Sequence, residues 1–107
     1  FRMTGSTVYA TPRLKQIVSQ IASEAKTRFG PKSRLIWFGS WPKGTARPTS
    51  DIDLAIRVEG GVPSSELARF RDWIEEDLPT LYRVDLINLD EVGEHMRRQI
   101  DAEGLIL

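Results

Sequence analysis

The sequence contains no cysteine and only one histidine, His95. These absences exclude disulfide scaffolds, zinc ribbons, cysteine nucleophiles and metal sites built from several histidines. Carboxylates are the only plentiful metal ligands that remain, and their hard oxygen atoms suit Mg²⁺. Any metal chemistry is therefore expected to depend on Asp and Glu.

The chain also lacks an excess of charge and a long apolar segment. Fifteen Lys and Arg residues balance fifteen Asp and Glu residues, which argues against a surface dedicated to duplex nucleic acid. The longest apolar run is 35–38, whereas a membrane-spanning helix needs about 18 apolar residues. Because the N-terminus has no apolar signal-peptide region, we expect a cytoplasmic protein without a membrane partner.

The length of 107 residues suits one domain covering 1–107. Apolar residues make up 40% of the chain and charged residues 28%, as in globular proteins. Met3 is a candidate native start, in which case Phe1 and Arg2 are additions.

Apolar spacing predicts helices alternating with strands. A helix is expected to open at Thr11-Pro12 and to end at Gly30-Pro31, followed by a buried strand over 35–38. Residues 39–50 form a loop rich in Gly, Pro, Thr and Ser, with a possible helical turn over 43–46. A second strand is expected over 51–58 because apolar and polar residues alternate there.

The second half of the chain continues this alternation. Ser64 or Ser65 is expected to cap a helix that Pro79 ends, and a third strand follows over 83–88. Asp90 is expected to cap a last helix that turns Val92, Met96 and Ile100 inward and closes at Gly104, before a short strand over 105–107. The resulting order is αββαβαβ, which indicates an α/β fold.

The most informative pattern is Gly39-Ser40, followed after ten residues by Asp51-Ile52-Asp53. Residues two apart on a strand share a face, about 6.6 Å apart, so both carboxylates can hold Mg²⁺ together with substrate phosphates. Glycines at 39 and 44 allow the backbone to approach a phosphate, and Ser40 and Lys43 can add donors. The alternative is a turn residue at 51 and a solvent-facing strand residue at 53.

Asp85 is an acid within an otherwise apolar strand, where burial costs several kcal/mol unless the carboxylate is paired or bound to a metal. Beside Asp51 and Asp53 it can act as a general base or as a ligand of a second metal. The alternative is an ion pair with Arg83 or exposure at a sheet edge.

These residues resemble the minimal nucleotidyltransferase family of the DNA polymerase beta superfamily. The resemblance rests on Gly39-Ser40, on Asp51-x-Asp53-Leu54 and on Val84-Asp85-Leu86, and it covers most of the chain. It implies a mixed β-sheet flanked by helices, ATP with Mg²⁺, and adenylyl transfer. It also implies metal ligation by Asp51, Asp53 and Asp85 and a phosphate contact at Gly39 and Ser40.

One segment departs from the family pattern. Many members carry Ser-Arg-Ala-Arg-Gly after the first strand, whereas this chain has Ser40-Trp41-Pro42-Lys43-Gly44. The triphosphate contact of the second Arg would pass to Lys43, which lacks the bidentate geometry of a guanidinium. Trp41 could stack on a base or a partner, or pack the loop onto the sheet.

The resemblance also implies a partner, because no separate acceptor-binding domain remains in the chain. Small family members often act beside a HEPN-domain protein, as the antitoxin that adenylylates a tyrosine of an RNase toxin in a hetero-oligomer. Two alternatives stay open. The chain could be the catalytic subunit of a two-component transferase whose other subunit binds a small molecule, or an antitoxin that only masks its partner.

Overall fold

The computed structural model describes residues 11–107, so Met3 and the first ten residues of the expected domain lie outside the described part. The chain forms a four-stranded mixed sheet flanked by helices, in the order α1 (Pro12–Phe29), β1 (Ser33–Phe38), α2 (Ser40–Lys43), β2 (Ile52–Val58), α3 (Ser64–Glu76), β3 (Val84–Asn88), a 3-10 turn η1 (Leu89–Glu91), α4 (Glu94–Glu103) and β4 (Leu105–Ile106). The expected α/β class and element order are confirmed.

The sheet has the strand order β3-β2-β1-β4. Strand β1 runs antiparallel to β2 and β4, whereas β2 and β3 are parallel. The C-terminal end of β1 therefore lies beside the N-terminal ends of β2 and β3, at one end of the strands, here called the acidic edge. This edge carries the acidic residues singled out in the sequence.

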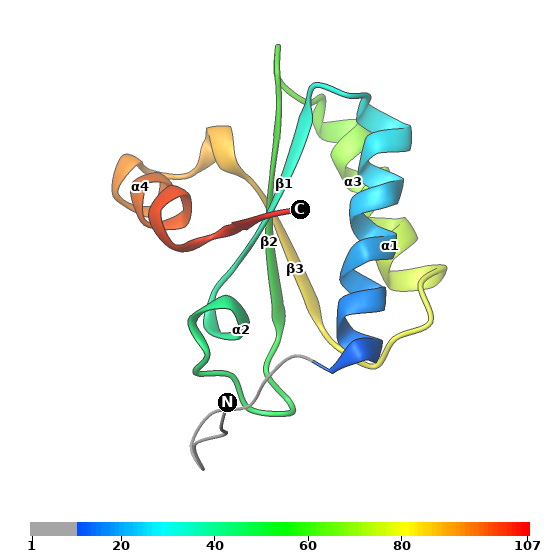
Figure 1. The fold of residues 1–107 in the computed structure, drawn as a ribbon. Coiled ribbons are helices and arrows are strands. Elements are labelled where there is room, and N and C mark those ends of the chain that lie inside the picture. The colour runs from blue at the N-terminus through cyan, green and yellow to red at the C-terminus, as the bar shows by residue number, and fades with distance from the viewer. Residues whose placement is uncertain (1–10) are drawn as a thin grey trace.

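Helices α1 and α3 cover one face of the sheet, and α4 covers part of the other (Figure 1). Alternation along β2 explains the division: Ile52, Leu54 and Ile56 are fully buried against α1 and α3. Ala55 points to the other face, where it packs with Ile100 of α4. Asp53 shares that second face.

Helix α1 begins as its sequence predicts. The Thr11 hydroxyl accepts a hydrogen bond from the Leu14 amide at 3.1 Å, and Pro12 occupies the first helical position, where its missing N–H costs nothing.

In the described part of the chain, no helix is long and apolar enough to span a membrane.

Local details differ from expectation at two helix starts. Helix α3 has Pro63 at its N-cap position and no side-chain cap, so neither Ser64 nor Ser65 caps it. Asp90 lies in η1 rather than at the start of α4, because the Asn88 side chain accepts the Asp90 amide at 3.0 Å and turns the chain earlier.

The helical turn expected over 43–46 lies instead in α2, at Ser40–Lys43. Gly39 and Gly44 bound it with positive φ angles of 82° and 77°, and Pro42 fits in its first turn, where N–H groups need no helical partner. Met96, expected to face inward, is 40% exposed.

We predict that Leu54→Ala lowers the free energy of unfolding by about 2–5 kcal/mol, because it removes a fully buried side chain. The same substitution at fully exposed Leu81 should change it by no more than about 0.5 kcal/mol. Urea unfolding of both variants measures the difference. Equal losses would contradict the placement of the core.

Candidate active site

A row of three side chains crosses the sheet at the edge where β2 and β3 begin. Phe38 is the register partner of Asp53 on β1, and Asp85 is its partner on β3. Neighbouring strands are about 4.8 Å apart, so the two acids stand side by side. Asp51 lies one residue before β2 and is half-buried. The strands thus bring the three sequence-predicted acids to the same edge.

Gly39 is packed directly against this row. Its φ of 82° lies in the region that favours glycine, and a Cβ at this position would collide with Oδ2 of Asp53. Residue 39 must therefore be glycine for β1 to turn into α2 beside the carboxylate. Ser40 follows as the first residue of α2, which places it next to the acidic edge.

Burial raises the pKa of Asp53, and the charges of Asp85 and Asp51 raise it further. The ionised form of this carboxyl is thus disfavoured in the folded protein. A bound cation would reverse the balance, because it would offset the repulsion among the acids.

Asp85 is not deeply buried, contrary to the expectation drawn from its apolar neighbours. Its side chain is 43% exposed, and its Oδ1 lies 3.4 Å from Nε of Arg83. The ion pair with Arg83, the alternative left open by the sequence, is therefore present. Asp85 is nevertheless the register partner of Asp53, and its carboxylate is accessible to solvent.

Trp41 packs the loop onto the sheet and is not open to stack on a base. It is 7% exposed, its indole N–H donates to the Ser50 carbonyl at 3.2 Å, and its ring lies edge-on to Tyr82 with centroids 6.3 Å apart. Trp41 therefore fixes α2 relative to the segment that leads into β3.

Lys43 forms an ion pair with α4. Its Nζ lies 3.6 Å from Glu103 Oε2, with both side chains partly exposed. This pair could not be predicted from the sequence, because Glu103 belongs to a helix that is distant along the chain. Gly44 ends α2 in the left-handed conformation, so its role here is in the backbone.

A sequence model described as a nucleotidyltransferase domain matches residues 18–107, which is most of the chain. The match includes the glycine-serine turn and all three acids. The chain belongs to this nucleotidyltransferase family. None of the curated proteins matches it in sequence.

Solved structures agree with this assignment. A structure described as a minimal nucleotidyltransferase is 27% identical, with a TM-score of 0.71, over 96% of this chain and all of that one. A toxin-antitoxin structure with AMP-PNP is 22% identical, with a TM-score of 0.63, over 81% of this chain and 69% of that one. A toxin-antitoxin structure named MntA-HpeT is 18% identical, with a TM-score of 0.65, over 82% and 69%. The last two show the shared fold.

The donor set of this nucleotidyltransferase suits a hard divalent cation. Asp51, Asp53 and Asp85 offer only carboxylate oxygens, and the pKa of Asp53 is raised first by burial and then by the charges of the other two acids. Within residues 11–107, no three His, Cys, Asp or Glu side chains converge closely enough to enclose an ion. Mg²⁺ usually keeps several waters and is held by one or two carboxylates together with substrate phosphates, so a Mg²⁺ site does not require a closed cage of protein ligands.

We predict that Asp53→Asn raises the thermal midpoint of the nucleotidyltransferase at pH 7. The folded-state pKa of Asp53 lies above its unfolded value, so the folded protein binds the extra proton and stability falls as pH rises between the two values. Asparagine removes this loss. Below both pKa values the two proteins should melt alike, because both carry a neutral side chain.

The matched control is Asp101→Asn on the exposed side of α4, which should melt like the parent at both pH values. A midpoint for Asp53→Asn that is lower than that of the parent at pH 7, with the control unchanged, would contradict the repulsion among the three acids.

Proposed function

We propose that this nucleotidyltransferase transfers AMP from ATP to a hydroxyl group, and that the acceptor is a tyrosine of a partner HEPN RNase toxin. The chain would then act as the antitoxin of the pair. The observation that carries the chemistry is the register pairing of Asp53 with Asp85, with Gly39 closed against Asp53. The toxin-antitoxin neighbours, one of them with AMP-PNP, support the partner class and the nucleotide.

In the proposed reaction the acceptor oxygen attacks the α-phosphorus of ATP. A bond forms between that oxygen and phosphorus, the bond from the α-phosphorus to the bridging oxygen breaks, and pyrophosphate leaves with the electron pair. The acceptor proton passes to Asp85 or to water. Divalent metal, when bound, supplies charge neutralisation at the phosphates and lowers the pKa of the attacking hydroxyl.

The chain's own residues divide the remaining tasks. Asp51 and Asp53 would hold the nucleotide's Mg²⁺, and Asp85 would hold a second ion or accept the proton. The Gly39-Ser40 turn lets the phosphates approach the backbone, and the Ser40 hydroxyl adds a donor. Lys43 can contribute to the triphosphate once it leaves Glu103, a surface pair that costs little to break.

The partial exposure of Asp85 supports its proposed role in accepting the proton of the incoming hydroxyl group. Its carboxylate faces solvent, whereas Asp53 is packed under Gly39. A group that takes a proton from an incoming hydroxyl must be reachable from outside, within about 3 Å of that hydroxyl. Arg83 limits this role only weakly, because the pair is exposed and solvent-screened.

The test is intact-mass spectrometry of the protein encoded beside this chain, after incubation with MgATP and this chain. We predict a mass gain in steps of one AMP. The Asp51→Asn/Asp53→Asn variant should give no gain, and Asp85→Asn should lower the rate by about 10²–10⁴-fold while retaining MgATP binding. The exposed Asp101→Asn is the matched control and should act like the parent.

The other outcomes have distinct meanings. A stable complex without a mass gain would contradict protein adenylylation and favour masking, or a small-molecule acceptor bound by the partner subunit. Turnover that is unchanged in Asp85→Asn would remove that residue from the reaction.

A further inference from the structure

A second row of charged residues lies at the opposite end of the same sheet face. Arg34, near the start of β1, and Arg57, near the end of β2, are register partners. Alternation places Arg57 on the face of Asp53, about 13 Å along the strand. Between the two rows, Ile36 and Ala55 are covered by Ile100 of α4.

The two arginines face each other at an electrostatic cost. Like charges directly opposite on antiparallel strands destabilise the pair. Arg57 is partly neutralised by Asp90, with Nε and Oδ1 3.4 Å apart. Arg34 is exposed and makes no ion pair with any residue in 11–107. Its guanidinium is therefore available to an anion from outside.

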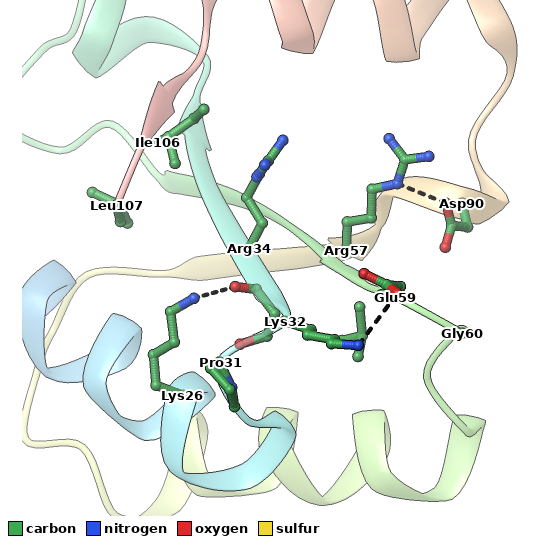
Figure 2. A pocket seen from close by; sticks show the side chains of 12 residues that line it. Lys26, Pro31, Lys32, Arg34, Arg57, Glu59, Gly60, Asp90, Ile106 and Leu107 are labelled. Atoms are coloured by element: carbon green, nitrogen blue, oxygen red, sulfur yellow. Dashed lines mark hydrogen bonds and ion pairs between the residues drawn. The ribbon is translucent and has the colours of Figure 1, made fainter.

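The arginines border a hollow of about 580 Å³ at this end of the sheet, here called the arginine hollow (Figure 2). Figure 2 shows the Arg34 and Arg57 side chains extending to the same side. Lys26, on α1, and Lys32, in the turn before β1, also line the hollow.

Both carboxylates of the arginine hollow are already engaged. Asp90 pairs with Arg57, and Glu59 lies 3.5 Å from Lys32 in a pair whose side chains are 71% and 72% exposed. The Lys26 ammonium donates a hydrogen bond to the Ser33 carbonyl. Four side-chain cations and two side-chain carboxylates line the hollow, in a chain whose net charge is zero.

We propose that the arginine hollow binds a small anion with two or more phosphate groups, such as inorganic tripolyphosphate or the triphosphate of a nucleotide. Paired guanidinium groups match phosphate oxygens in bidentate geometry, and the volume lies within the range of small-molecule pockets. The net charge of zero disfavours a long nucleic-acid backbone as the ligand. The site is separate from the acidic edge and does not depend on the proposed transfer reaction.

The test is titration of the full chain with tripolyphosphate in the presence of EDTA, followed by NMR and by the thermal midpoint. We predict shifts of backbone amides at 33–34 and 57–60 and a rise in the midpoint. Arg34→Gln and Arg57→Gln should each weaken binding about tenfold, the loss of one charge-assisted hydrogen bond. Arg69→Gln, at an exposed position of α3, is the matched control and should bind like the parent.

Stability without ligand separates lost binding from lost folding. Because Arg34→Gln removes repulsion, its midpoint in the absence of tripolyphosphate should equal or exceed that of the parent. ATP is titrated beside tripolyphosphate, and the loss of affinity in the arginine variants should be the same for both, because both present a triphosphate.

Three results would overturn the proposal. The first is a set of NMR chemical-shift changes confined to the backbone amides of 39–44, which would assign binding to the glycine-serine turn. The second is unchanged affinity in both arginine variants. The third is equally tight binding of citrate with the same arginine dependence, which would show that the hollow responds to charge and not to phosphate.

Discussion

The close approach of Gly39 to the Asp53 carboxylate is the constraint on which the site depends. No side chain fits between them, so β1 can turn into α2 only because residue 39 is glycine with a positive φ. Asp53 is also partly buried, and burial together with the charges of Asp85 and Asp51 raises its pKa. The backbone turn at Gly39 and the charge of Asp53 therefore depend on the same close packing at the acidic edge.

The rest of the fold serves to hold that edge in place. Parallel pairing of β2 with β3 fixes Asp85 beside Asp53, and the apolar side of β2 anchors the strand to α1 and α3. Trp41 ties α2 to Tyr82, just before β3. The sheet and its helices thus hold side by side acids whose mutual repulsion would otherwise push them apart.

Much of this arrangement could be predicted from the sequence because the signals are local. Helical spacing and glycine or proline boundaries predicted the element order, and alternation over 51–58 placed Asp53 on the face opposite Ile52. The glycine-serine pattern followed by Asp-x-Asp indicated the family, which the match over 18–107 confirms.

What the sequence could not predict depends on contacts between distant segments. The Lys43–Glu103 pair joins helices far apart in the chain, and the opposition of Arg34 and Arg57 exists only in the β1–β2 register. The exposure of Asp85 depends on which strand lies at the sheet edge, because β3 has a neighbour on one side only. The predicted start of α4 was wrong because the Asn88 side chain turns the chain before Asp90 can act as a cap.

The most direct measurement of the central claim is transfer of a radiolabel from ATP to the partner protein. ATP labelled at the α-phosphorus and ATP labelled at the γ-phosphorus are compared, each with the parent chain and with Asp51→Asn/Asp53→Asn. We predict label on the partner only from the α position and only with the parent. Label from the γ position, or equal labelling by the variant, would contradict nucleotidyl transfer by the acids beside Gly39.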